Sequence, residues 1–324
     1  MEWFGGDCMD TKKSLLSEED IKRCYITPAL ERVWPACDIR MEKPITDGRV
    51  NIRGNMEMRE RPKFADYVLY THAGYPLAIV EAKDNKHNVS FGIQQAKTYA
   101  QMMDIQFAYS SNGDAFAEYD FLTGVEREFP LDEFPSQEML AARLKEEAHL
   151  TQKEIKVIEQ PFYVSEDTYA PRYYQQVAVD RALGAIARGQ QRILLVMATG
   201  TGKTYTAFQI IYRLRKAGLK KKILYLADRN ILVDQSIQQD FRPLANVIHK
   251  VNYAADDRTT ITAYEVYFSL YQQLFGENDE ERFRELFDPG FFDLIVIDEC
   301  HRGSAKADGR WRRILDYFQD ATQI

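Results

Sequence analysis

The apolar and polar positions at the start of the chain follow a helical pattern. Ser17 precedes three consecutive acidic residues, which is typical of a helix N-terminus. Thr27 and Pro28 are typical of a cap and a first-turn proline, and they predict a second short helix that ends near Trp34. About the first forty residues are therefore predicted to be mostly helical.

Short β-type runs replace this pattern in the next part of the chain. The expected elements are strands at 65–71 and 76–83, a helix at 89–103, and strands at 105–110 and 115–121. The last two strands flank Asn112 and Gly113, a dipeptide suited to a tight hairpin turn. Together these elements predict one compact α/β domain.

The second half of the chain alternates strictly between helix and strand. The expected elements are helices at 172–188 and 203–217 and buried apolar strands at 192–197, 222–227 and 291–297. Such alternation predicts a parallel sheet covered by helices. A charged helix at 136–148 and a polar, extended passage precede this half, so we place the domains at 1–165 and 166–324.

Length and composition fit two globular domains and say little about partners. The 324 residues are 45% hydrophobic and 28% charged, and the net charge of −7 gives no general reason to expect a nucleic acid. DNA must therefore be argued from motifs. The sequence contains no apolar run of the roughly 20 residues that cross a bilayer, and its start does not resemble a signal peptide. A cytoplasmic protein is expected.

A phosphate-binding loop follows the strand expected at 192–197. Its residues, in order, are Ala198, Thr199, Gly200, Thr201, Gly202, Lys203 and Thr204. The two glycines let backbone N–H groups close around the β-phosphate, while Lys203 reaches the β and γ oxygens and the Thr204 hydroxyl ligates Mg²⁺. The alternative is a glycine-rich turn that binds nothing. The order of strand, loop, Lys-Thr and helix favours ATP.

An acidic pair ends a later apolar strand. Asp298 is placed to hold Mg²⁺ through a water molecule, and Glu299 to orient or deprotonate the attacking water. Taken alone, such a pair is a common solvated strand end. About a hundred residues after a phosphate-binding loop, it predicts the second half of an ATP site.

These motifs resemble those of the superfamily 2 helicases and translocases. That resemblance accounts for Met197, where the general P-loop consensus has glycine, and it identifies Asp298 to His301 as a DExH box. It implies that Gln175 reads the adenine edge, although the start of an ordinary amphipathic helix is the alternative. It also implies that residues 227–229 contact the nucleic-acid backbone.

Charged residues stand on the two strands predicted at 65–71 and 76–83. Glu81 and Lys83 share a face with Ile79 because strand side chains alternate, and the paired strand could bring Asp66 alongside. Two carboxylates and an ammonium suit a Mg²⁺ ion that activates water for phosphodiester cleavage. This is the D…ExK nuclease pattern. The ExK triplet alone is weak evidence for a nuclease. However, Glu81 ends an apolar run, and an acid at such a position is expected to have a role.

The helix expected at 89–103 carries Gln95 and Tyr99 one turn apart on one face. Helix surface is the ordinary interpretation of such a pair. However, residues 61–70, 76–85 and 92–99 together resemble the nuclease domain of the R (HsdR) subunit of type I restriction enzymes. In that family an Asp, a Glu-x-Lys and a Gln-x-x-x-Tyr precede a superfamily 2 motor.

The resemblance extends over most of the chain and implies a restriction-endonuclease-like, PD-(D/E)xK, domain followed by a RecA-like P-loop domain. It carries Asp66, Glu81 and Lys83 over as the metal centre, with Gln95 and Tyr99 beside it. Glu31, an acid from the first helical region, is a further candidate for the same centre, and whether it joins the site stays open at this point. The implied ligands and partners are ATP, Mg²⁺, double-stranded DNA, and modification (M) and specificity (S) subunits.

The family's motor has two lobes, with ATP between them, and the second lobe supplies an arginine. The sequence stops soon after the DExH box, so we expect a fragment that hydrolyses ATP very slowly. Two alternatives stay open at this point. One is a superfamily 2 helicase whose N-terminal domain is a non-catalytic docking module, and the other is a P-loop signalling or transport ATPase unrelated to DNA.

Overall fold

The computed structural model places the chain in two compact units. The described residues are 12–46, 50–53, 56–59, 61–165, 170–227, 236–253, 255–270, 273–275, 280–298 and 312–324. The first unit comprises Met1–Leu150 with Arg172–Val177, and the second comprises Thr151–Pro171 with Ala178–Ile324. Each unit is described by itself.

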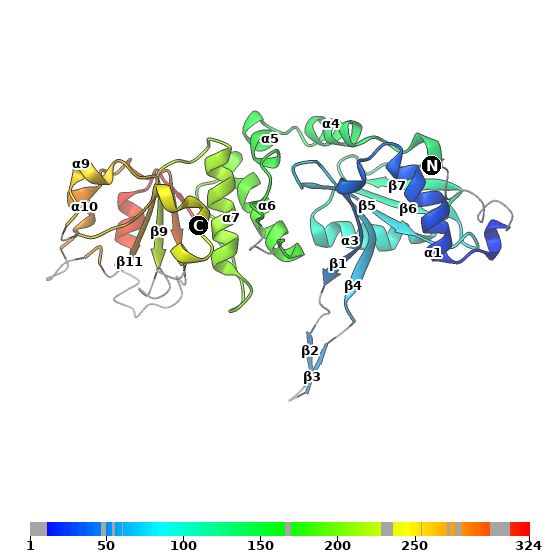
Figure 1. The fold of residues 1–324 in the computed structure, drawn as a ribbon, viewed down its shortest axis with the longest axis horizontal. Coiled ribbons are helices and arrows are strands. Elements are labelled where there is room, and N and C mark those ends of the chain that lie inside the picture. The colour runs from blue at the N-terminus through cyan, green and yellow to red at the C-terminus, as the bar shows by residue number, and fades with distance from the viewer. Residues whose placement is uncertain are drawn as a thin grey trace. The chain divides into compact units, whose positions relative to one another are not determined.

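A mixed six-stranded sheet forms the first unit, with the strand order β1-β4-β5-β6-β7-β8 (Figure 1). The strands are β1 (Ile39–Thr46), β4 (Lys63–Tyr70), β5 (Pro76–Ala82), β6 (Phe107–Ser111), β7 (Ala115–Asp120) and β8 (Glu126–Pro130). Only β5 and β6 pair in parallel; the other neighbours are antiparallel. A separate ladder joins β2 (Val50–Arg53) to β3 (Met56–Arg59).

Helices cover both faces of this sheet. They are η1 (Lys13–Leu15), α1 (Glu18–Ile21), η2 (Lys22–Ile26), α2 (Thr27–Glu31), η3 (Ala36–Asp38), η4 (Val89–Gly92), α3 (Ile93–Met103), η5 (Leu131–Glu133) and α4 (Gln137–Glu147). On one face, α3 packs on Val68 and Ile79. On the other, the N-terminal helices and α4 pack on Tyr67 and Val80. Alternate strand residues thus supply two separate cores.

The N-terminal helices differ from the prediction at Thr27. Ser17 caps the first helix with a capping box, as the acidic residues that follow it predicted. The helical path then continues through a π-helical turn, η2, so Thr27 begins α2 without capping it. Its hydroxyl instead lies 2.9 Å from the Tyr67 hydroxyl. The Thr27 side chain, which the local sequence predicts to cap a helix, therefore takes part in a tertiary hydrogen bond.

The β-hairpin around Asn112 and Gly113 is confirmed. β6 and β7 pair antiparallel on either side of it, and Gly113 has a φ of +85°, a conformation that side chains with a Cβ rarely adopt. The strands predicted at 65–71 and 76–83 are likewise confirmed as the antiparallel pair β4 and β5.

A parallel five-stranded sheet forms the second unit, with the order β10-β11-β9-β12-β13. Its strands are β9 (Ile223–Ala227), β10 (Ile248–Lys250), β11 (Val266–Leu270), β12 (Leu294–Ile297) and β13 (Thr322–Gln323). The described part of the chain further contains the helices α5 (Gln152–Ile158), α6 (Tyr173–Ala187), α7 (Lys203–Lys216), η6 (Arg242–Val247), α9 (Arg258–Ile261) and α10 (Phe283–Leu286). The predicted parallel α/β architecture is confirmed.

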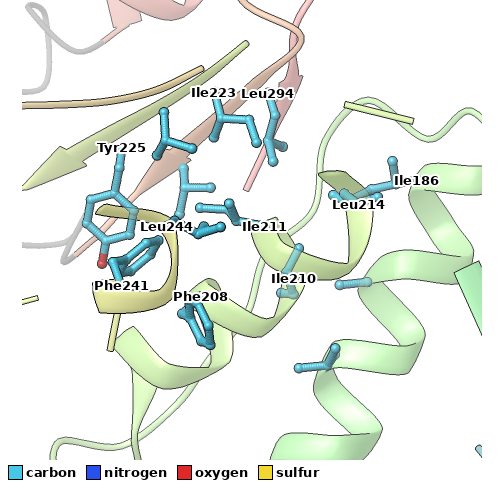
Figure 2. Packing of buried hydrophobic residues seen from close by; sticks show 14 of the residues in the cluster. Ile186, Phe208, Ile210, Ile211, Leu214, Ile223, Tyr225, Phe241, Leu244 and Leu294 are labelled. Carbon is cyan, nitrogen blue, oxygen red and sulfur yellow. The ribbon is translucent and has the colours of Figure 1, made fainter. Parts of the chain in front are cut away.

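Both faces of this second sheet are buried. Figure 2 shows one face, where Phe208 and Ile211 of α7 pack against Ile223 and Tyr225 of β9. The opposite face buries Leu224 and its neighbours in a second cluster. Burial on both faces explains why these strands are continuous apolar runs in the sequence.

The strand predicted at 192–197 is reduced to a single bridge. Arg192 pairs with Gln323, and the Ile193 N–H donates to the Gln323 carbonyl at 2.9 Å. Further along, Leu194 and Val196 are 74% and 88% exposed. The neighbouring strand β13 spans only Thr322–Gln323, so the residues that follow Ile193 have no partner for a ladder.

The polar passage after residue 148 contains a helix that the sequence pattern did not predict. Thr151 caps α5 with a capping box to Glu154. The buried Arg213 of α7 donates to the Val157 carbonyl at 3.1 Å, and Val157 joins the core of the second unit. These contacts place residues 151–165 with the second unit, whereas our sequence boundary lay after residue 165. None of the helices that the structure describes is long and apolar enough for a bilayer.

Candidate functional site

Asp66 and Glu81 lie side by side on the adjacent strands β4 and β5. The register pairs Tyr67 with Val80, and this alignment sets the two acids opposite each other. The Asp66 backbone N–H donates to Glu81 Oε1 at 3.3 Å, and the Ala82 N–H donates to Asp66 Oδ2 at 2.8 Å. The two carboxylates that the sequence singled out therefore converge.

Glu81 is fully buried, and only one of its two carboxyl oxygens has a hydrogen-bond partner in the described part of the chain. Its side chain is 0% exposed, and Oε2 has no hydrogen-bond partner among the described residues. Burial, together with the nearby charge of Asp66, raises the pKa of Glu81 to about 8, against the opposing effect of Lys83. A buried, unsatisfied carboxylate oxygen is costly, so the structure leaves one acceptor ready for a cation.

Lys83 lies next to this pair at the end of β5. Its backbone N–H donates to the Ser111 carbonyl at 2.8 Å, which continues the pairing of β5 with β6. Its side chain packs against Gly92, where an added Cβ would come within 3.3 Å of Lys83 Cγ. The glycine therefore leaves room for the lysine stem beside the start of α3.

Gln95 and Tyr99 share one face of α3, as predicted. Gln95 Nε2 donates to the Tyr99 hydroxyl at 3.3 Å. Burial raises the pKa of Tyr99, and the nearby carboxyl group of Glu81 raises it further. Ser110 ties the start of this helical region to the sheet: its hydroxyl donates to the Val89 carbonyl at 2.7 Å and accepts from the Gly92 N–H at 3.1 Å.

Two further residues of the centre escaped sequence reasoning. Lys22 Nζ lies 2.6 Å from Asp66 Oδ1, and Glu18 Oε2 lies 4.0 Å from Lys83 Nζ. Burial raises the pKa of Glu18, with Lys83 opposing and Asp66 adding to the rise. Their spacing was a usable signal, because residues at i and i+4 share a helix face.

Glu31, the acid that the sequence suggested from this region, is exposed at the end of α2. Among the described residues, no hydrogen bond or ion pair joins Glu31 to Asp66 or Glu81. Its participation stays a prediction.

The donor set fits a hard divalent ion. Carboxylate oxygens are the ligands that Mg²⁺ prefers, and Mg²⁺ binds proteins through as few as one or two carboxylates while it keeps several waters. The described residues contain no group of three or more His, Cys, Asp or Glu side chains that could hold a metal ion. An ion at this site would therefore rely on Asp66 and Glu81.

The phosphate-binding loop has the backbone that a nucleotide requires. Gly200 and Gly202 have φ values of +77° and +82°, so both need glycine. The Thr201 hydroxyl donates to the Ala198 carbonyl at 2.6 Å and closes the turn. Lys203 begins α7, a helix of 14 residues, so backbone N–H groups at its N-terminus remain available for phosphate. Thr199 lies in the same turn.

Asp298 is held beside this loop by a residue that the sequence did not suggest. The Tyr225 hydroxyl of β9 donates to Asp298 Oδ2 at 3.0 Å, and the Thr204 side chain is also hydrogen-bonded to this phenol. Burial raises the pKa of Tyr225 well above its usual value, and Asp298 raises it further. Tyr225 thus links the two side chains predicted to coordinate the nucleotide's Mg²⁺.

A cavity of about 370 Å³ adjoins Lys203 and Asp298 in the second unit. Its remaining lining is largely apolar and includes Leu194, Val196 and Ile297. Glu299, Cys300, His301 and the motif residues 228 and 229 lie outside the described residues.

Gln175 is buried at the start of α6, in the segment that belongs to the first unit. Its Oε1 accepts from the Arg172 N–H at 2.9 Å. Adenine recognition by Gln175 stays a prediction.

Comparison with known proteins separates the two halves of the chain. Residues 168–324 match the family model described as "Type III restriction enzyme, res subunit". Residues 46–120, which include Asp66 and Glu81, match the model described as "Type I restriction enzyme EcoKI endonuclease subunit second domain". The first match covers the phosphate-binding loop and Asp298.

A curated relative extends the match across both halves. The type I restriction enzyme EcoAI endonuclease subunit of Escherichia coli is 46% identical over 96% of this chain. The chain belongs to the R subunit family of type I restriction enzymes. The EcoKI endonuclease subunit of Escherichia coli strain K12, another member, is 27% identical over 81% of the chain.

A solved R subunit structure agrees with the fold. The fragment structure of a protein assigned as the HsdR subunit of a type I restriction enzyme from Vibrio vulnificus YJ016 matches 95% of the chain, with a TM-score of 0.74 and 36% identity. This likeness supports a RecA-like, helicase-type fold with a parallel sheet. The chain spans 39% of the EcoAI subunit, 27% of the EcoKI subunit and 54% of the Vibrio chain.

Proposed function

We propose that this chain is the nuclease domain and first motor lobe of a type I R subunit, which cleaves DNA with Mg²⁺ and translocates it with ATP. The observation that carries the nuclease half is the convergence of Asp66 and Glu81 around a buried, unsatisfied carboxylate oxygen. The N-terminal domain is accordingly proposed to be restriction-endonuclease-like. The relationship to the EcoAI subunit favours this function over a docking module or an unrelated P-loop ATPase.

Asp66 and Glu81 would hold the Mg²⁺ ion, and the ion would lower the pKa of a bound water and screen the phosphodiester. The chain's own groups complete the site. Lys83 lies beside the carboxylates and is proposed to orient the water or stabilise charge on the scissile phosphate. Gln95 and Tyr99, which are hydrogen-bonded to each other on α3, are proposed to position the DNA backbone at this site.

The motor half is proposed to bind ATP at the loop from Thr199 to Thr204. Backbone N–H groups and Lys203 would neutralise the phosphates, while Thr204 and Asp298 would hold Mg²⁺. Glu299 is the proposed catalytic acid of hydrolysis, and Gln175 the proposed adenine contact. Tyr225 supports this arrangement because it is hydrogen-bonded to both Thr204 and Asp298.

The proposed partners are double-stranded DNA and the M and S subunits of a type I restriction complex in the cytoplasm. DNA recognition would then reside in the S subunit. Nothing in the net charge of −7 opposes this, because the DNA-contacting groups would be local.

Single substitutions test the nuclease half. Asp66→Ala and Lys83→Ala should each abolish Mg²⁺-dependent nicking of supercoiled plasmid while the affinity for a fluorescent ATP analogue stays unchanged. Lys13→Ala, which removes the ion pair with Asp114, is the matched control and should cut like the parent. Cleavage by the Asp66 variant at the parent's rate would refute the proposal.

The motor half makes a separate prediction. Residues 1–324 should bind ATP weakly and hydrolyse it very slowly, because an arginine that completes such a site is worth about 10³ to 10⁵ in rate. A coupled phosphate-release assay with and without DNA measures this. Brisk, DNA-stimulated turnover by these residues alone would contradict it.

A further inference from the structure

Lys22 is a buried lysine whose ammonium group contacts three carboxylates. Its Nζ lies 2.6 Å from Asp66 Oδ1, 2.8 Å from Glu19 Oε1 and 2.9 Å from Glu42 Oε1. The lysine side chain is 4% exposed, and a lysine ammonium has three N–H donors. Each donor therefore has a carboxylate acceptor.

The local backbone explains how Lys22 reaches this position. It begins the π-helical turn η2, which directly follows the short helix α1. Glu19 precedes it by three residues, and Glu42 comes from β1, the strand next to β4. The ammonium thus bridges the helix, the edge of the sheet and Asp66.

The two oxygens of Asp66 have separate roles. Oδ1 contacts the Lys22 ammonium, whereas Oδ2 accepts from the Ala82 N–H on the Glu81 side. Glu19 and Glu42 retain exposed side chains, at 76% and 58%, while Asp66 is 11% exposed. The contact that is shielded from water, and therefore the strongest, is the one between Lys22 and Asp66.

A cation surrounded by three carboxylates has the surroundings of a hard metal ion. We propose that the Lys22 ammonium acts as a fixed second cation of this centre. It occupies the position beside Asp66 where a second divalent ion would bind, and it therefore limits the centre to one divalent ion. The inference rests on the proposed function, because it assumes that Asp66 and Glu81 hold the first ion.

This assignment agrees with the surrounding acids. The described residues contain no group of three or more side chains that could hold a metal ion. Asp66, Glu19 and Glu42 nevertheless all contact one point, the Lys22 ammonium. That point is already filled by Nζ. Removal of the ammonium would leave three carboxylates without a countercharge, which is an arrangement that binds a divalent cation.

Lys22→Ala tests the proposal because it removes both the charge and the bulk. The number of Mn²⁺ ions bound is counted by titration, with electron paramagnetic resonance of free and bound Mn²⁺, in the full chain without nucleotide. An Asp66→Ala chain gives the number of ions bound elsewhere, to be subtracted. The parent should bind one ion that depends on Asp66, and Lys22→Ala two, with the spectral broadening of a close Mn²⁺ pair.

Lys22→Arg is the matched control, since it keeps a cation at the same place and should bind one ion. Lys22→Ser provides a second neutral variant in case the alanine variant does not fold, as judged by circular dichroism. Two Asp66-dependent ions in the parent, or one in each folded neutral variant, would overturn the proposal. If the parent and Asp66→Ala bind equal numbers of ions, the proposed metal centre itself fails, which is a distinguishable result.

Discussion

The carboxyl group of Glu81 decides the character of the first unit's site. It closes an apolar strand, is fully buried, and keeps one oxygen without a partner among the described residues. Core positions normally exclude such a group, because an unpaired buried polar atom costs about 1 to 3 kcal/mol. The presence of this carboxyl group in the core is therefore the main argument, at the scale of single residues, that the site binds a cation.

The elevated pKa of Glu81 gives a pH-dependent stability. The folded-state pKa is about 8 and the ordinary value is 4.5, so folding favours the protonated form. The stabilising contribution is complete below pH 4.5 and is lost as the pH rises through about 8. We expect the free energy of unfolding of the metal-free chain to fall in this window, by up to a few kcal/mol, since one pKa unit corresponds to about 1.4 kcal/mol.

Urea denaturation in the presence of EDTA, at pH values between 5 and 8, measures this effect. Glu81→Gln keeps the shape but does not ionise, so its stability relative to the parent should increase steadily with pH. Parallel pH profiles for the parent and the variant would show that Glu81 does not titrate as described.

Tyr225 makes a second prediction at the scale of single residues. Tyr225→Phe should keep the stacking on Phe268, at a centroid distance of 4.8 Å, and lose the hydrogen bonds of the hydroxyl to Asp298 and Thr204. A hydrogen bond to a charged group contributes about 1.5 to 3 kcal/mol. We expect the affinity for Mg²⁺ and a fluorescent ATP analogue to fall by roughly ten-fold or more.

Tyr253→Phe is the control for this experiment, because it removes another buried hydroxyl of the same unit, which lies 3.4 Å from Ser269 Oγ. That variant should bind nucleotide like the parent. If Tyr225→Phe also binds like the parent, the link between Tyr225 and Asp298 has no part in nucleotide binding.

At the scale of elements, the sequence pattern correctly predicted those helices, strands and turns that interactions between residues close in sequence determine. The strands β4 and β5, helix α3 and the hairpin at Gly113 were all expected, because apolar periodicity and turn chemistry specify them. The exceptions depend on distant contacts. Thr27 pairs with Tyr67 and does not cap a helix, and α5 is fixed by the contact of Arg213 with Val157.

The junction of β5, β6 and α3 offers a test at this scale. A Cβ at Gly92 would lie 2.8 Å from Ser110 Oγ, closer than real contacts allow. Gly92→Ala should therefore destabilise the chain by about 1 to 3 kcal/mol and reduce plasmid nicking, because Lys83 and α3 must shift. Gly290→Ala is the control, since nothing lies within 4 Å of its added Cβ. Equal stability and nicking for both variants would contradict the packing described.

At the scale of the whole molecule, the chain consists of two units with separate cores and separate candidate sites. The sequence predicted the acids and the phosphate-binding loop because each has a recognisable motif. It did not predict Lys22, Glu18 or Tyr225, because their places depend on which segments the fold brings together. Motifs therefore point to the proposed ligands, but they do not point to the side chains that contact those ligands.

Separate sites predict separable activities. Lys203→Ala should weaken binding of the ATP analogue strongly, because the lysine neutralises phosphate charge, while Mg²⁺-dependent nicking by residues 1–324 persists. Lys216→Ala, at the far end of α7, should leave nucleotide binding unchanged. Loss of nicking in a folded Lys203 variant would show that the two sites depend on each other.

The central claim is that Asp66 and Glu81 hold a divalent ion, and anomalous X-ray scattering from Mn²⁺-soaked crystals tests it most directly. The account predicts an anomalous peak within coordination distance of both carboxylates in the parent, about 2.0 to 2.3 Å for such hard cations, and no peak there in Asp66→Ala crystals. Well-ordered parent crystals, soaked at saturating Mn²⁺, that show no peak between the two acids would contradict it.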